Sequence, residues 1–171
     1  MKKRTKWVLA SFAAAGVIAG VALATPTVGL IVNNILVTGT SNRDIHAHAF
    51  VAIPGGDDDG FSAELETEGA SNFVVQDAVF APGGTTGWHT HPGILLLSLT
   101  PDSSPIDWYD ARCGKHVYQP GDSWTEGTTL HDVVNPGPAN AHLAVTYVIA
   151  KGMSKRLDHA APACAAALGL N

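Results

Sequence analysis

Two histidines one residue apart, His89 and His91, are the residues of this sequence best placed to do chemistry. On a strand, residues i and i+2 point to the same face with Cα atoms roughly 6.6 Å apart, so both rings can reach one metal ion. On a helix the same spacing would place them on different faces. His131, which opens a later apolar run, offers a third imidazole. Because neutral imidazole is a good ligand for transition metals, the three together predict a divalent metal site.

The segments that must position these histidines read as short β-strands. Runs rich in Val, Ile and aromatic residues alternate with Gly, Pro and Asn along most of the chain. Short strands at this spacing are typical of a sandwich or barrel rather than of βαβ units. The predicted strands cover residues 28–32, 35–37, 45–53, 73–80, 89–91, 94–99, 106–109, 115–118, 123–125, 131–134 and 141–150. In residues 94–99, the positions that point to either face of a strand are mostly apolar, which predicts a strand buried on both faces.

Three segments have less regular patterns. Residues 54–60 contain Pro, Gly and three consecutive aspartates, so we expect a loop there. Residues 62–68 fit either an edge strand or a short helix. Residues 160–168 are rich in alanine and fit either a short helix or an extended tail.

The spacing of the histidines and of nearby glycine, proline and asparagine residues is that of two motifs: Gly83-x5-His89-x-His91, then Gly114-x5-Pro120 and His131-x3-Asn135. Over about residues 73–148, the chain resembles the cupin superfamily in these two motifs. The resemblance implies an all-β fold, an antiparallel cupin-type β-barrel (double-stranded β-helix, or jelly roll) with a metal at its centre. We assign residues 25–150 to this barrel and residues 151–171 to a C-terminal tail.

One element of the cupin pattern is absent. The family usually has a glutamate four or five residues after the second histidine, where this chain has Leu95 and Leu96. Asp132 neighbours His131 and should face the other side of a regular strand. Glu126 lies five residues before His131 and also has the wrong parity, although the glycine that follows it could break the register. We therefore predict a site of three histidines: His89, His91 and His131.

Three neutral ligands would leave the full 2+ charge of the metal at the site, which should favour an anionic co-ligand or substrate. The metal's identity (Fe, Zn, Mn, Ni or Cu) stays open. By analogy only, thiol dioxygenases and some diketone-cleaving cupins resemble this arrangement in using three histidines.

Two functions fit these observations. The first is an exported metalloenzyme, an oxygenase or isomerase that acts on a small polar or anionic molecule. The second is a non-catalytic module that binds a small ligand such as a sugar or an acid. A barrel without metal, kept for interaction, is disfavoured by the intact histidines. No general acid or base can be assigned, so the catalytic residues stay unknown.

The other histidines have a plainer interpretation. His46 and His48 repeat the spacing, but no glycine stands five residues before them and no third histidine follows at motif distance. We expect them to be packed or strand-edge histidines. No role is assigned to His116, His142 or His159.

The N-terminus has the pattern of a secretory signal peptide. A basic start precedes an apolar run over residues 7–24, which ends in Ala22-Leu23-Ala24. The alternative is an uncleaved membrane anchor, since the run is nearly long enough to span a bilayer of ~30 Å. We expect export to the extracellular space or cell envelope, with residues 1–24 removed and no stable membrane association afterwards.

The net charge of the chain limits the kinds of molecule that it is expected to bind. Removal of residues 1–24 takes away four lysine or arginine residues and no acid, which changes the formal net charge from −5 to −9. An acidic domain without a basic patch argues against nucleic acid or anionic membrane as a partner. A small-molecule ligand is expected, and the sequence leaves a homodimer open.

The chain has two cysteines, Cys113 and Cys164. In an oxidising compartment such a pair more often forms a disulfide than two free thiols. The bond would tie the C-terminal tail to the barrel and, on the chain-entropy model, stabilise the fold by roughly 4 kcal/mol. Two exposed thiols, or pairing between chains, are the alternatives.

Cleavage after Ala24 is directly testable. N-terminal sequencing of the exported protein should begin at Thr25, because the small-residue site ends at Ala24. Intact Met1 in a membrane fraction would instead establish the anchor.

Overall fold

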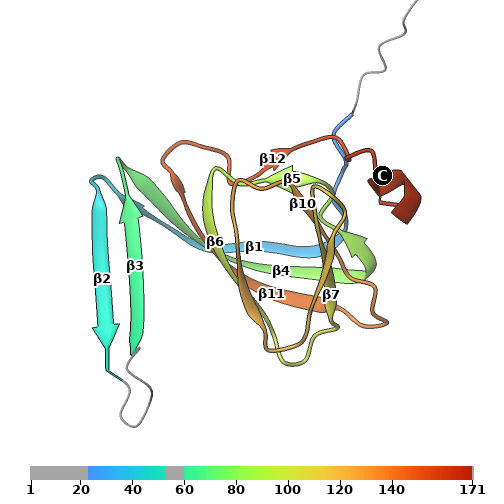
Figure 1. Cartoon of the computed structure of the whole chain (residues 1–171), viewed down its shortest axis with the longest axis horizontal. Helices are drawn as coiled ribbons and strands as arrows, with labels where there is room; N and C mark the ends of the chain where they lie inside the picture. The colour runs from blue at the N-terminus through green and yellow to red at the C-terminus, as the bar shows by residue number, and fades with distance from the viewer. Residues whose placement is uncertain (1–22, 53–59, 171) are drawn as a thin grey trace, which may run out of the picture.

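The computed structural model describes residues 23–52 and 60–170, and within them it is almost entirely β-structure (Figure 1). This confirms the predicted all-β class. The one helical segment among these residues is a short 3₁₀ turn, η1 (Ala165–Leu168). The strands are β1 (Val28–Ser41), β2 (Ile45–Val51), β3 (Phe61–Thr67), β4 (Ser71–Thr85), β5 (His89–Thr90), β6 (Gly93–Leu99), β7 (Ile106–Asp110), β8 (Lys115–Tyr118), β9 (Ser123–Glu126), β10 (His131–Val134), β11 (Ala141–Ala150) and β12 (Leu157–Asp158).

Nearly all of the predicted signal peptide lies outside the described residues, as does most of the predicted loop at residues 54–60. Across the part of the chain that is described, no helix has both the length and the apolar character needed to cross a membrane.

Ten strands form a nearly closed antiparallel barrel in which β4 is the central element. β4 pairs with β1, β10 and β11, and β11 in turn pairs with β6. β5, β7 and β10 form the opposite wall, where β10 pairs with both of the others. The two walls, which surround the centre of the barrel in Figure 1, enclose the hydrophobic core.

Inward-facing and outward-facing residues alternate along the strands, and the inward-facing ones form this core. The inward residues of β4 include Val74, Ala78 and Phe80, and those of β11 include Leu143 and Val145. Such a period of two is what one buried and one open face of a sheet require.

Two strand predictions need correction. The asparagines at 33–34 do not interrupt the first strand, because β1 runs from Val28 to Ser41 in one piece. β6 is not buried on both faces: Leu95 and Leu97 are buried, but Ile94 is 50% and Leu96 54% exposed. The apolar residues at both parities therefore give β6 a core face and an open apolar face.

β2 and β3 form a separate two-stranded sheet that projects beside the barrel (Figure 1). Residues 62–68, for which strand and helix were both open, lie mostly within β3.

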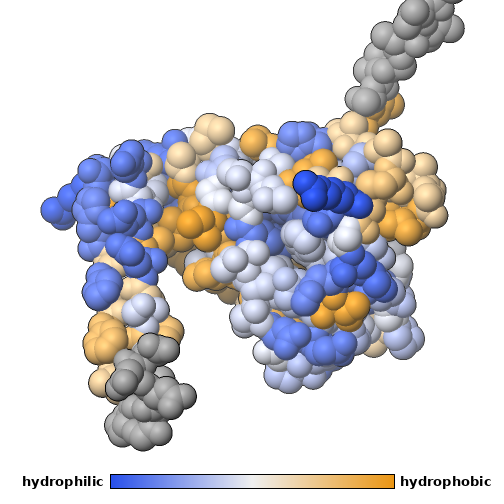
Figure 2. Space-filling model, in the orientation of Figure 1, coloured by the Kyte–Doolittle hydropathy of each residue, from blue (hydrophilic) through white to orange (hydrophobic). Residues whose placement is uncertain are grey.

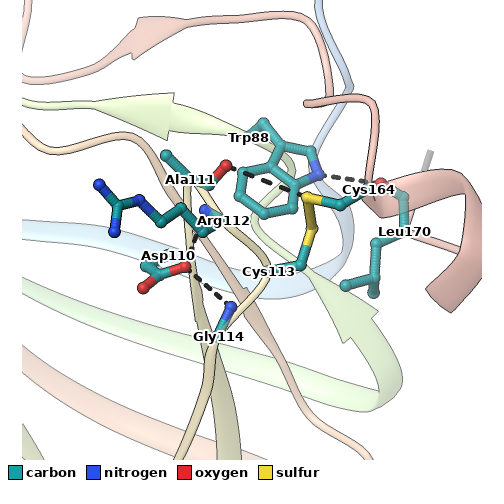
Figure 3. The surroundings of a disulfide bond; sticks show 8 residues. All are labelled: Trp88, Asp110, Ala111, Arg112, Cys113, Gly114, Cys164 and Leu170. Atoms are coloured by element: carbon teal, nitrogen blue, oxygen red, sulfur yellow. Dashed lines mark hydrogen bonds between the residues drawn. A yellow bond between two sulfur atoms is a disulfide. The ribbon is translucent and has the colours of Figure 1, made fainter.

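The C-terminal segment is fastened to the barrel at several points. β12 pairs with β5, and the indole of Trp88 donates a hydrogen bond to the carbonyl of Leu170, 2.9 Å away. A disulfide joins Cys113 to Cys164, with Cα atoms 6.1 Å apart (Figure 3). The predicted pairing is therefore present in the structure.

The turn that presents Cys113 is unusually well defined. Cys113 has φ of +61°, a left-handed conformation that few non-glycine residues adopt. The carboxylate of Asp110 accepts hydrogen bonds from the backbone N–H groups of Arg112 and Gly114, each 2.8 Å long (Figure 3). This network holds the turn in place.

We expect peptide mapping of the non-reduced protein to recover Cys113 linked to Cys164. Cys164→Ser should lower the free energy of unfolding by up to about 4 kcal/mol, because the bridge closes a loop of 51 residues. Chemical denaturation measures the change. Alkylation of both thiols without prior reduction would contradict the bridge.

Candidate metal centre

The structure brings the three predicted histidines together in the barrel interior. His89 lies on β5 and is the direct cross-strand partner of His131, the first residue of β10. His91 follows β5 immediately. The ring centroids lie 4.2 Å apart for His89 and His131, 4.7 Å for His89 and His91, and 5.2 Å for His91 and His131. All three residues are at least 96% buried.

Glu126 belongs to the same cluster as a fourth residue. Its exclusion from the site, which assumed that strand alternation turns it away from His131, was therefore wrong. Glu126 is 8% exposed, and one ligand atom from each of the four residues lies within 4.8 Å of the others. Parity holds only along one regular strand, whereas β9 ends at Glu126 and β10 begins at His131. The four residues between them reset the direction of the side chains.

Strand pairing explains how Glu126 reaches the position of the missing motif carboxylate. Leu95 stands where the cupin pattern often has glutamate, and Glu126 on β9 is its cross-strand partner. Directly paired residues of an antiparallel sheet project to the same face, with Cβ atoms roughly 5 Å apart. The neighbouring strand thus supplies the carboxylate that β6 lacks. The glutamate before a glycine is visible in the sequence. Its place in the site follows only from the pairing register of β6 and β9.

Each imidazole is held by a hydrogen bond from its Nδ1 atom to a backbone carbonyl. The partners are Gly87 for His89, Lys155 for His91 and Thr129 for His131, at 2.7, 2.7 and 2.8 Å. A carbonyl can only accept, so each Nδ1 carries the proton. The Nε2 atoms are then left with free lone pairs, so in this tautomer Nε2 can bind a metal.

The carboxylate is oriented in a similar way. Its Oε1 atom accepts hydrogen bonds from the indoles of Trp108 and Trp124, both at 3.1 Å. Its Oε2 atom lies 3.4 Å from Nε2 of His91 and 3.1 Å from Nε2 of His131. The sequence pattern alone did not identify these two tryptophans as donors to Glu126.

The Nε2 atoms of His91 and His131 are buried and lack a hydrogen-bond partner, although Oε2 of Glu126 lies 3.4 and 3.1 Å from them. A buried polar atom without a partner costs about 1–3 kcal/mol. Three nitrogen lone pairs and one carboxylate oxygen that converge on a common point fit a metal ion, which would satisfy all of them at once.

The pKa shifts that burial and neighbouring charges cause agree with this geometry. Burial, with the charges of His131 and Arg156 nearby, lowers the pKa of His89 to about 2, so this ring stays neutral. Burial alone would raise the pKa of Glu126, but the interactions with His131, His91 and Trp124 outweigh it and the pKa falls below its usual range. Burial opposes the charged form of His131, yet Glu126 raises its pKa overall.

Glu126 also changes the expected charge. With one carboxylate among the ligands, a divalent ion would leave a net charge of about +1 at the site rather than 2+. The predicted preference for anions must therefore depend on other groups.

A cavity of about 140 Å³ adjoins the cluster, and His89, His91 and Glu126 contribute to its lining. Most of its other walls are apolar. The polar exceptions include Gln76, Lys155 and Arg156. A space of this size suits a small molecule only.

Two basic side chains, Lys155 and Arg156, line this cavity from the segment between β11 and β12. The ammonium of Lys155 donates to Oε1 of Gln76 and lies 5.3 Å from the ring centroid of Tyr147. Burial lowers the pKa of Lys155. Arg156 donates to the carbonyl of Thr86, 2.6 Å away, and pairs with Asp158. Because the carbonyl of Lys155 also fixes His91, this one segment serves both the cluster and the cavity.

The remaining histidines lie elsewhere. His46 and His48 are exposed on β2, in the separate sheet, where His46 Nδ1 is 3.6 Å from Glu66. His142 pairs with Asp77 at 2.6 Å, and His159 contacts Thr90 at 3.0 Å. Within residues 23–52 and 60–170, the four-residue cluster is the only group of metal-ligand type whose ligand atoms all lie within 4.8 Å of one another.

Comparison with known proteins finds similarity in structure only. No family model matches, and no curated protein matches. A double-stranded β-helix protein from Klebsiella pneumoniae is 19% identical, with a TM-score of 0.43 over 50% of this chain and 73% of that one. A cupin-like protein from Thermotoga maritima is also 19% identical, with a TM-score of 0.43 over 52% and 65%. An oxalate oxidase in complex with glycolate is 19% identical, with a TM-score of 0.39 over 44% and 41%.

This chain thus spans less than half the length of the oxalate oxidase, and likeness at this level carries nothing about ligand or activity. The antiparallel β-barrel that the motif resemblance implied is present in this chain.

Proposed function

We propose that this chain is an exported metal-binding cupin. One divalent transition metal is held by Nε2 of His89, His91 and His131 together with Oε2 of Glu126, and a small anionic molecule binds beside it. The observation that carries the proposal is the convergence of four buried ligand atoms whose opposite ends are each held by hydrogen bonds.

The metal, when bound, would supply a Lewis acid or a redox centre, depending on whether it is Zn, Fe, Mn, Ni or Cu. The chain itself contributes the surroundings. Apolar walls such as Leu97 and Val145 exclude water, and Lys155 and Arg156 balance negative charge on a ligand. Burial raises the pKa of Tyr147, which keeps this phenol protonated beside His91. These features fit an oxygenase- or isomerase-like enzyme.

A non-catalytic module that captures a small acid is the second candidate. It is favoured by Lys155 and Arg156, which place positive charge at the cavity and so suit the capture of an anion. The two candidates differ in turnover: an enzyme loaded with its metal converts a small anion that it binds, whereas a binding module returns the anion unchanged.

Export is supported by the anchoring of Thr25, the first residue after the proposed cleavage site. Its backbone N–H donates to the carbonyl of His159 at 3.0 Å, and its hydroxyl accepts from the N–H of Trp88 at 2.6 Å. A chain that began at this residue would keep its N-terminus fastened to the barrel. The disulfide is compatible with an oxidising compartment.

The metal content of the purified protein tests the proposed metal site. Protein purified without an affinity tag should contain about one metal ion per chain, as measured by mass spectrometry of the elements. His91→Ala should lower this well below stoichiometric, and Glu126→Gln should weaken metal binding at least tenfold because the carboxamide carries no charge. His142→Ala, on the outer surface, is the matched control. Full metal content in the His91 variant would refute the site.

The anion preference has its own test. Lys155→Met keeps the apolar stem and removes the charge, so we expect glycolate, a small carboxylate probe, to bind the metal-loaded protein about tenfold more weakly. Isothermal calorimetry measures the affinity. Lys151→Met is the matched control, because that exposed lysine bonds to Asn42 instead. Equal affinities in the two variants would remove Lys155 from the ligand site.

A further inference from the structure

The hairpin of β2 and β3 carries a second pair of histidines with one residue between them, His46 and His48, which takes no part in the barrel cluster. Neither histidine is packed in a core: both are exposed, and β2 pairs with β3 alone. Residues i and i+2 of a strand point to the same face, so the two imidazoles lie side by side. What they can bind depends on the residues opposite them.

The pairing register places a glutamate directly opposite each histidine. His46 pairs with Glu66, and His48 pairs with Glu64. Directly paired residues of an antiparallel sheet project to the same face, with Cβ atoms roughly 5 Å apart. Two imidazoles and two carboxylates therefore share one face of the hairpin. We call these four residues the hairpin quartet.

One pair of the quartet already has the spacing that a metal ion requires. Nδ1 of His46 lies 3.6 Å from Oε1 of Glu66, which is too long for a hydrogen bond. Two ligands bound at ~2.1 Å with tetrahedral angles lie roughly 3.4 Å apart. The side chains of His46 and Glu66 are 66% and 65% exposed, and His48 and Glu64 are exposed as well. All four can therefore rotate toward a shared ion.

The charge of this face favours a divalent cation. Neither strand of the hairpin contains a lysine or an arginine, and in the described part of the chain the only ion-pair contact of Glu64 or Glu66 is the one with His46. Two carboxylates with two neutral imidazoles carry a charge of −2, which one divalent ion cancels. Figure 2 shows hydrophilic residues over the end of the hairpin away from the grey segment at its tip, where the register places His46 and Glu66.

We propose that the hairpin quartet is a second metal site, which binds one divalent ion such as Zn²⁺ through both imidazoles and both carboxylates. Imidazole and carboxylate together suit an ion of this borderline class. Four protein ligands close a tetrahedral site, the arrangement of a structural rather than a catalytic zinc. The site lies on a separate sheet and shares no residue with the barrel cluster, so the two proposals are independent.

The ion would link β2 to β3 through their side chains. The two strands form a sheet of their own, and an isolated two-stranded ribbon is at best marginally stable in water. Because an ion that binds the paired strands does not find its ligands together in separated ones, its binding free energy stabilises the hairpin.

Zinc titration tests the site, because an exposed site can be filled by added metal. Protein purified without an affinity tag should bind one zinc ion per chain beyond its barrel metal, as measured by isothermal calorimetry. His46→Ala, His48→Ala and Glu66→Gln should each weaken this binding at least tenfold. His116→Ala is the matched control: His116 is also exposed on a strand, but it lies opposite Trp108 rather than a carboxylate, so zinc binding should be unchanged.

The variant His91→Ala separates the two metal sites. It should lose the barrel metal and still bind zinc at the hairpin with the affinity of the wild type, so the hairpin site can be confirmed even if the barrel site is refuted. Wild-type protein that binds no zinc beyond the barrel metal would overturn the hairpin site, as would additional zinc binding that His46→Ala leaves unchanged.

Proteolysis supplies a second measurement on the same proteins. Added zinc should slow cleavage within β2 and β3 at least threefold in the wild type and in His116→Ala, because the ion holds the two strands together. Zinc should give no protection in His46→Ala. Equal protection in His46→Ala and the wild type would contradict binding at the quartet.

Discussion

The hydrogen bonds from the three imidazoles to backbone carbonyls are the constraint on which the rest of the site depends. Each carbonyl fixes both the orientation of a ring and the nitrogen that carries its proton. The free Nε2 lone pairs then converge without any side chain being flexible. Two indoles do the same for the carboxylate of Glu126. A barrel is suited to this because its paired strands hold backbone carbonyls at fixed distances.

The segment between β11 and β12 connects the histidine cluster to the adjoining cavity. Its Lys155 supplies a carbonyl to His91 and an ammonium group to the cavity, from the same residue. Arg156, the next residue, reaches back to the carbonyl of Thr86 near β5. A displacement of this segment would therefore affect the orientation of His91 and the charge of the cavity together.

The barrel is fastened at its C-terminal end by unrelated interactions that reinforce one another. The disulfide, the indole of Trp88 and the short β12 pairing all hold residues 157–170 against β5 or the turn before β8. Because β5 carries His89, these attachments lie close to the histidine cluster. Order in the tail thus supports order in the site.

The sequence by itself determined the all-β class, the three histidines and the cysteine pair, because each depends on local spacing or on residue count. The i, i+2 spacing of His89 and His91 is a property of any strand. Only the tertiary structure decided the role of Glu126, since its place in the site follows from pairing with Leu95, a residue 31 positions away. It also decided which face of β6 is open. Local patterns show that a strand has apolar residues on both sides, but burial depends on which other strands lie across from it, and that is a property of the closed barrel.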